Sequence, residues 1–177
     1  VTIPSTLSFR SAESFVLSKS KWIIEKIEYF NSKEIKLIES GIYKTRNHTL
    51  HFIPTVNDKI TVRLKDHDIN VYYPQSIDIT NEQIQNAAKK GIEHAYRIES
   101  KAILPDRVKL LSEKFGYKYS KIAIKKASTR WGSCSARNNI NLSIFLMKLP
   151  EVLIDYIILH ELCHTVHKNH GPKFWAE

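Results

Sequence analysis

The stretch PEVLIDYIILHELCHTVHKNHG, Pro150 to Gly171, joins a long apolar run to four of the chain's eight histidines. Proline at an early helical position and an acidic residue in the first turn favour a helix start, so we predict one helix from Pro150 to Lys168. Its centre, Val152 to Leu159, is nearly all apolar. We therefore expect this helix to be buried on most faces, and histidines on such a helix need polar partners.

His160, Glu161 and His164 form the pattern H-E-x-x-H. Residues four apart on a helix project from one face, so both imidazoles can reach a single ion. Glu161 is offset round the helix and suits a general base that acts on a metal-activated water. Zinc prefers two imidazoles, a further protein ligand and an open water position. The competing interpretation is a pair of hydrogen-bonded core histidines beside an ordinary glutamate.

Two histidines further along are candidates for the third ligand. His167 continues the helical face, but it lies about 10 Å along the axis from His160, too far for one ion on a straight helix. We expect Asn169 to end the helix in the left-handed conformation and to bring His170 back to the metal. His167 is then a surface residue, a neighbour of the ligands or a substrate contact.

The stretch TRWGSCSARNNINLSIFL, Thr129 to Leu146, precedes the helix. In zincin proteases the edge strand before the active-site helix pairs with an extended substrate, and strand addition of this kind supplies main-chain hydrogen bonds. We assign that role to Asn139, Ile140, Asn141 and Leu142. Arg130 is a candidate for stabilising an oxyanion or for binding a substrate carboxylate or phosphate; a surface role is an equal alternative.

The segment Thr129 to Trp175 resembles the YgjP-like metallopeptidase family, zincin-like zinc hydrolases that are distantly similar to SprT-like proteases. The resemblance rests on R-W-G-S-C-S at Arg130 to Ser135, on the I-N-L strand from Ile140, on H-E-L-x-H, on His170 and on Phe174-Trp175. It departs at Ser143, where the family usually has asparagine. The resemblance implies one zinc ion on His160, His164 and His170, and it says little about the substrate.

The rest of the chain predicts helices and a small β element. An N-terminal helix has apolar positions at Phe15, Val16, Trp22, Ile23, Ile27 and Phe30. Alternating residues from Gly41 to Tyr73, with turn signals at VNDK and KDHD, predict a small antiparallel element. A helix over 80–103 follows, capped by Thr80 or Asn81 and interrupted by Pro105, then a helix over 106–116 that Gly116 ends. We predict strands in Tyr119–Ala127 and Asn139–Leu146.

These elements indicate an α+β fold, a zincin-like metallopeptidase core whose active-site helix follows the antiparallel β element and helices. We expect residues 1–78 to hold the N-terminal helix and β element and residues 79–177 to form the metallopeptidase domain, the two together making one compact unit. Because the chain starts at Val1 and ends in the pattern of a first helical turn, we expect residues to be missing at both ends.

The net charge of +9 is concentrated in one segment. Residues 105–148 carry 10 basic and 2 acidic side chains, a patch that can attract nucleic acid, nucleotides or acidic peptides, or that is simply a solvated face. Cys134 and Cys163 are too few for a disulfide framework and favour reduced thiols in a cytoplasmic protein. The chain has no run of about 18 apolar residues, so its sequence predicts no membrane-spanning helix.

The sequence therefore favours a zinc-dependent metallopeptidase that acts on peptides or proteins. One alternative is a metal-dependent nucleotide phosphohydrolase, with Arg130, Lys125 and Lys126 binding phosphates, although no glycine-rich phosphate loop is present. The other is a basic nucleic-acid-binding module with structural zinc, which an open fourth position on the metal argues against. The patterns do not indicate an oligomeric state.

Overall fold

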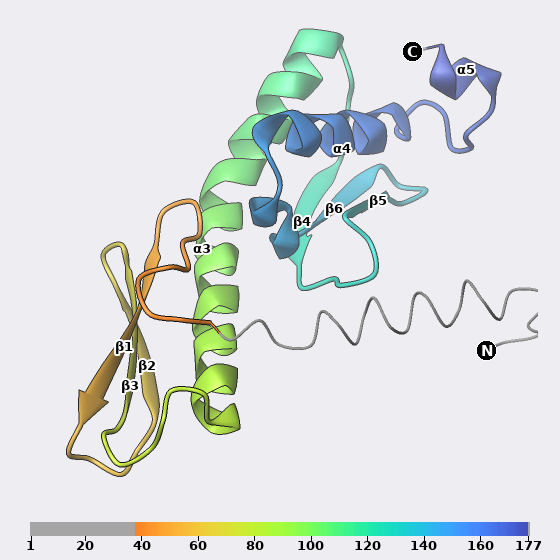
Figure 1. Cartoon of the computed structure of the whole chain (residues 1–177). Helices are drawn as coiled ribbons and strands as arrows, with labels where there is room; N and C mark the ends of the chain where they lie inside the picture. The colour runs from red at the N-terminus through yellow and green to blue at the C-terminus, as the bar shows by residue number, and fades with distance from the viewer. Residues whose placement is uncertain (1–37, 177) are drawn as a thin grey trace, which may run out of the picture. The chain divides into compact units, whose positions relative to one another are not determined.

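A long central helix, α3, contacts two small three-stranded sheets in this mixed α+β fold (Figure 1). The structure, a computed structural model, describes residues 38–176 apart from the side chain of Trp175. The predicted N-terminal helix lies outside these residues. The elements are β1 (Thr49–Thr55), β2 (Thr61–Lys65), β3 (Asp68–Pro74), α3 (Glu82–Phe115), β4 (Lys121–Lys125), β5 (Gly132–Cys134), β6 (Asn139–Ser143), the 3-10 helix η1 (Ile144–Lys148), α4 (Glu151–Cys163) and α5 (Pro172–Trp175).

Helix α3 is one continuous element of 34 residues, so the prediction that Pro105 interrupts it is wrong. Its ends are as expected, since the Asn81 side chain accepts from the Gln83 N–H at 2.9 Å and Gly116 closes the helix at φ 76°. The proline removes the hydrogen bond to the carbonyl of Lys101, an exposed residue that water can reach. Buried Leu104 and Val108 on either side of the proline hold the helix by packing, which outweighs local propensity.

The first sheet has the strand order β1-β3-β2. The pairing of β2 with β3 is antiparallel, across a two-residue turn in which Asp66 has φ 53°. β1 and β3, however, are parallel, which corrects the expectation of a purely antiparallel element. Alternation in the sequence shows which faces are apolar but not which strands are neighbours. The strand with two fully buried residues, Ile69 and Val71, takes the middle place and therefore pairs on both sides.

The first half of α3 packs closely on this sheet. A Cβ on Gly91 would lie 2.7 Å from the Ile69 Cγ2 and 2.8 Å from the Val62 Cγ1, so the glycine allows the helix to approach. Buried Glu99 also ties the segment before β1 to the helix, because its Oε1 accepts from the Thr45 hydroxyl and the Asn47 N–H and lies 2.8 Å from the His48 Nδ1. Packing and buried polar contacts therefore both fix this sheet on α3.

The second sheet has the order β4-β6-β5, with β4 parallel and β5 antiparallel to the central β6. The expected strand Asn139–Leu146 ends at Ser143, where the chain enters η1. The Ser143 hydroxyl donates to the Ala127 carbonyl at 2.7 Å and accepts from the Phe145 N–H at 3.2 Å. The residue that departs from the family pattern is thus the N-cap of a 3-10 helix.

Helix α4 buries one stripe along its length, made by Ile154, Ile158 and Leu162, and near its end it also buries Glu161 and Cys163. Val152 is 78% exposed and Tyr156 57% exposed, so the expectation of burial on most faces is wrong. The second half of α3 holds α4 through Arg107 Nε, 2.5 Å from the Asp155 Oδ1.

Among the described residues, no helix combines the length and the hydropathy that crossing a bilayer requires.

Candidate metal centre

Helix α4 ends earlier than the sequence predicts, at Cys163 instead of Lys168, with His164 as its C-cap. The Thr165 hydroxyl donates to the Leu162 carbonyl at 2.7 Å, a local bond that competes with helix continuation. Asn169 is not in the left-handed conformation, which among the described non-glycine residues only Asp66 and Asn138 adopt. The turn that the sequence places at Asn169 therefore begins at His164.

The early turn brings three imidazoles together. One ring nitrogen from each of His160, His164 and His170 lies within 4.8 Å of the others. The Nε2 atoms of His160 and His170 are 3.0 Å apart. Mutual repulsion adds to burial in lowering the pKa of His160 below its ordinary value, with burial the larger cause. Neutral imidazoles are the form that binds metals.

The three rings are supported by their surroundings. The Nδ1 of His164 lies 2.9 Å from the backbone carbonyl of His167, so this nitrogen carries the proton and leaves Nε2 as the ligand atom. Buried Phe174 packs its ring 5.0, 4.7 and 4.7 Å from the centroids of His160, His164 and His170. Short helix α5 therefore holds the cluster from one side.

The cluster fits a tetrahedral metal ion. Zinc–nitrogen bonds of about 2.0–2.1 Å place ligand nitrogens roughly 3.3 Å apart. The Nε2 atoms of His160 and His170 are close to that spacing, and small side-chain rotations bring the His164 nitrogen within reach. Three imidazoles with one position left over match the ligand set of catalytic zinc sites, since structural sites use four protein ligands.

Glu161 is 6% exposed and follows His160, one of the candidate ligands, in α4. Burial raises the pKa of the Glu161 carboxyl to about 7, against the opposing effects of the Arg130 charge and of a hydrogen bond from the Cys134 backbone N–H. A bound dication would favour the carboxylate further. The side chain is thus buried, but it has a cationic neighbour and a backbone donor.

Strand β5 packs directly against Glu161. A Cβ on Gly132 would lie 2.7 Å from both Cγ and Oε1 of Glu161 and 2.9 Å from its Cδ. The Gly132 φ is not in the left-handed region, so this glycine is required for space and not for backbone conformation. Only a residue without a side chain leaves the Glu161 carboxyl where it lies.

The structure contradicts the assignment of Asn139, Ile140, Asn141 and Leu142 to a substrate-binding edge strand. They lie in β6, which pairs with β4 on one side and β5 on the other, so neither edge is open. Ile140 and Leu142 are core residues at 0% and 1% exposure. The sheet edge next to the metal ligands belongs to β5, which the sequence analysis did not recognise as a strand.

The remaining candidates have distinct positions. Arg130 precedes β5, and its charge acts on Glu161. His167 does not belong to the three-imidazole cluster, and its backbone carbonyl accepts from His164. Sequence reasoning missed Gly132 and Phe174. The available signal was that Gly132 is an isolated glycine in a strand, a position where another group often approaches the backbone closely.

The whole chain, residues 1–177, matches the model of the YgjP-like metallopeptidase domain. The chain therefore belongs to the YgjP-like metallopeptidase family, and this membership indicates a metal-dependent hydrolase. A search of curated proteins found no match. Among solved structures, the chain is similar to the metallopeptidase zymogen of Methanocaldococcus jannaschii jannalysin, at 32% identity over 41% of this chain and 74% of that chain, with a TM-score of 0.37.

Proposed function

We propose that the protein is a zinc-dependent metallopeptidase with a single zinc ion on His160, His164 and His170. The observation that carries this proposal is the meeting of these three ring nitrogens within 4.8 Å. Glu161, next to His160 on the same helix, supplies a carboxylate beside the site. Family membership supports peptide or protein as the substrate.

Each group has one task in the proposed reaction. Zinc bound at this site would polarise the scissile carbonyl and lower the pKa of a water molecule to about 7. Glu161 takes a proton from the attacking water while the water oxygen forms a bond to the carbonyl carbon. When the carbon–nitrogen bond breaks, Glu161 passes that proton to the leaving amine. Arg130 supplies positive charge near Glu161 and the developing oxyanion.

The outer edge of β5 is the proposed place for the peptide backbone. The Trp131 carbonyl accepts from the Ser143 N–H at 2.8 Å, and the Ser135 N–H donates to the Asn139 carbonyl at 2.9 Å. Both groups therefore point toward β6. Because successive residues of a strand direct their backbone groups to opposite edges, the N–H and C=O groups of Gly132 and Cys134 point to the outer edge of β5. There the Cys134 N–H donates to the Glu161 carboxyl. An extended peptide added at this edge runs past Glu161.

Glu161→Gln tests the proposed function. The variant keeps the three imidazoles, so we expect it to bind one zinc per chain and to cleave an unstructured protein such as casein at least a hundredfold more slowly, the range typical of a lost general base. Glu151→Gln, an exposed change on the same helix, is the matched control. Unchanged cleavage in Glu161→Gln would remove Glu161 from the reaction.

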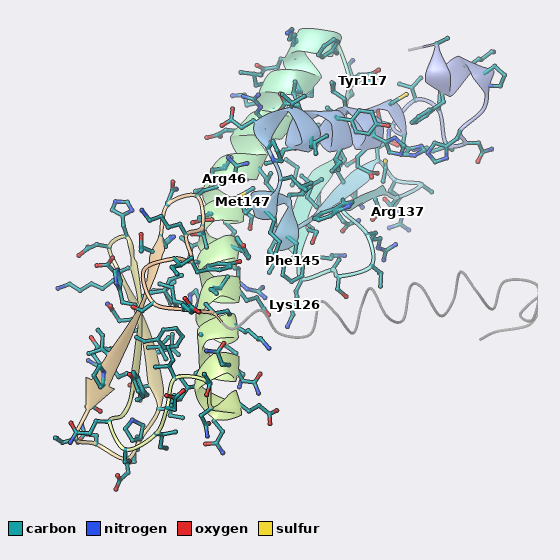
Figure 2. The ribbon with its side chains drawn as sticks, viewed as in Figure 1. Arg46, Tyr117, Lys126, Arg137, Phe145 and Met147 are labelled. Carbon is teal, nitrogen blue, oxygen red and sulfur yellow. The ribbon has the colours of Figure 1, made fainter. Side chains whose placement is uncertain are left out.

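Nucleic-acid binding through residues 105–148 stays a hypothesis. Arg107 in this segment pairs with Asp155, and Lys126 (Figure 2) lies with its Nζ 2.7 Å from the Glu93 Oε2. Both contacts reduce the free positive charge of the patch.

The two free thiols favour a cytoplasmic location. The division of the chain into residues 1–78 and 79–177 also remains a prediction.

A further inference from the structure

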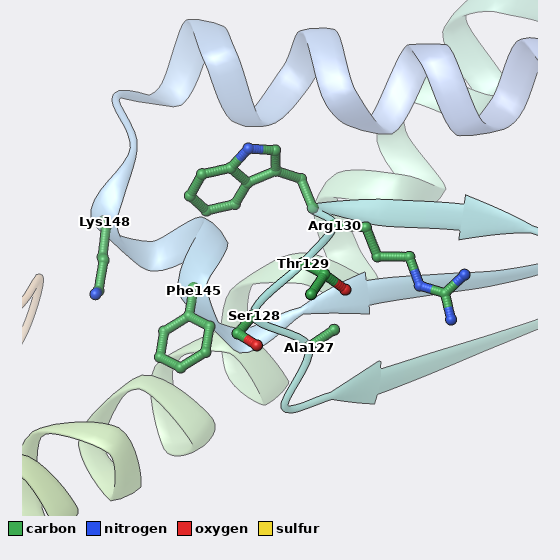
Figure 3. A pocket seen from close by; sticks show the side chains of 7 residues that line it. Ala127, Ser128, Thr129, Arg130, Phe145 and Lys148 are labelled. Atoms are coloured by element: carbon green, nitrogen blue, oxygen red, sulfur yellow. The ribbon is translucent and has the colours of Figure 1, made fainter. Parts of the chain in front are cut away.

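A pocket of about 310 Å³ opens at the start of β5 (Figure 3). We call it the Trp131 pocket and define it by its lining residues Ala127, Ser128, Thr129, Arg130, Trp131, Phe145 and Lys148. Its walls combine two aromatic rings, two hydroxyl groups and two cations. None of the described residues that line it is acidic.

Neither cation of this pocket forms an ion pair within the described part of the chain, although the Arg130 charge acts on Glu161. Arg130 and Lys148 are absent from the ion pairs of residues 38–176, whereas Arg46, Arg107 and Lys126 pair with acidic groups. The Lys148 Nζ lies 4.9 Å from the centroid of the Phe145 ring and 5.7 Å from that of Tyr96. These rings hold the ammonium group near the pocket without cancelling its charge.

The pocket adjoins, along the chain, the strand that contacts Glu161. Trp131 is followed by Gly132, the first residue of β5, where a Cβ would lie 2.7 Å from the Glu161 side chain. Arg130 lines the pocket, and in Figure 3 its guanidinium extends along the sheet, away from Phe145 and Lys148. A chain lying on the outer edge of β5 therefore passes from the pocket to Glu161 within the length of one short strand.

We propose that the Trp131 pocket binds a carboxylate of the peptide substrate and so selects for acidic peptides. The carboxylate interacts with Lys148, and its aliphatic stem packs on Trp131 and Phe145. The source is an Asp or Glu side chain or the terminal carboxylate, which share this chemistry. The proposal rests on the peptidase function, because it assigns the pocket to a substrate of that site.

The test is a binding measurement on the zinc-loaded Glu161→Gln protein, which does not depend on turnover. The probes are fluorescein-labelled peptides that differ only by Glu or Gln at each position in turn, each with a free or an amidated C-terminus. We expect one acidic position to bind about tenfold tighter than its Gln counterpart, as suits a charge-assisted contact. Tightening by the free C-terminus alone would identify the terminal carboxylate as the source.

Lys148→Met is the diagnostic substitution, because Lys148 is exposed and its loss leaves the core intact. We expect it to reduce the Glu-over-Gln preference to about one. Lys121→Met removes an equal charge from β4 outside the pocket and should leave the preference in place. Equal binding of the Glu and Gln peptides and of both C-terminal forms, a preference that survives Lys148→Met, or equal losses in the two variants would overturn the proposal.

Cleavage by the wild-type protein separates this inference from the proposed function. If Glu161→Gln binds acidic peptides through Lys148 but the wild-type protein hydrolyses none, the pocket stands and the peptidase assignment falls. If the wild-type protein hydrolyses peptides without any acidic preference, the peptidase stands and the pocket assignment falls.

Discussion

Gly132 has no Cβ atom, and the Glu161 side chain occupies the space that this atom would need. A Cβ there would overlap the Glu161 side chain at 2.7 Å, whereas the open space at Gly171 would accept one freely. Since Glu161 is almost fully buried, its carboxyl has little room to move aside and keep its direction. Gly132 is therefore a positioning residue for the proposed general base.

We predict that Gly132→Ala keeps zinc and loses activity. The added methyl group should displace the Glu161 carboxyl while leaving the three imidazoles in place, so kcat/KM should fall to near the level of Glu161→Gln, about a hundredfold or more. Metal analysis and peptide hydrolysis on the same preparations check both parts.

The double variant Gly132→Ala/Glu161→Gln shows whether the two residues act together. If Gly132 works through Glu161, the double variant should be about as active as Glu161→Gln alone, since effects within one unit are not additive. A further large loss in the double variant would mean that Gly132 matters for another reason, such as contact with the substrate backbone.

Residue-scale predictions from the sequence succeeded where geometry is local. The i, i+4 spacing of His160 and His164 places both rings on one side of α4, as helical geometry requires. The meeting of His170 with them was also expected, but by a turn at Asn169 that the structure does not show. The contact of Gly132 with Glu161 joins residues 29 positions apart, and no local pattern reports it.

Helix ends show the same difference at the scale of elements. Gly116, in the left-handed conformation after α3, was predictable because only glycine adopts it readily. The continuity of α3 through Pro105 was not, because buried contacts on both sides of the proline decide it. Strand order in both sheets likewise depends on pairings that alternation alone does not encode.

We predict that Gly116→Ala lowers the free energy of unfolding by about 1 kcal/mol, the cost of placing a side chain in the left-handed region. Nothing lies within 4 Å of the new Cβ, so backbone strain is the only cause. Urea denaturation measures the change.

Gly171→Ala is the matched control, because its φ is −77° and its Cβ also meets nothing within 4 Å. Its free energy of unfolding should not fall, and should rise by up to about 1 kcal/mol, because alanine fits this backbone and restricts the unfolded chain. Equal losses in the two variants would contradict the role of the left-handed conformation at Gly116.

At the scale of the whole molecule, the candidate metal centre uses parts from distant positions. α4 and the turn after it supply the imidazoles, α5 supplies Phe174, and β5 fits against Glu161. Helix α3 contacts α4, η1 and β4 and so holds these elements as one framework. The sequence indicated the candidate ligands and the α+β class. The proposed substrate edge is β5 instead of β6, because β6 is the central strand.

The central claim is a zinc site on His160, His164 and His170, and metal content tests it most directly. Wild type, His170→Ala and His167→Ala would be purified without metal-affinity tags and measured by elemental mass spectrometry. We predict about one zinc per chain in wild type and His167→Ala, and a large loss in His170→Ala, since removing one of three imidazoles weakens the site sharply. Wild-type protein that binds no metal when zinc is offered, or loss in His167→Ala with retention in His170→Ala, would contradict the account.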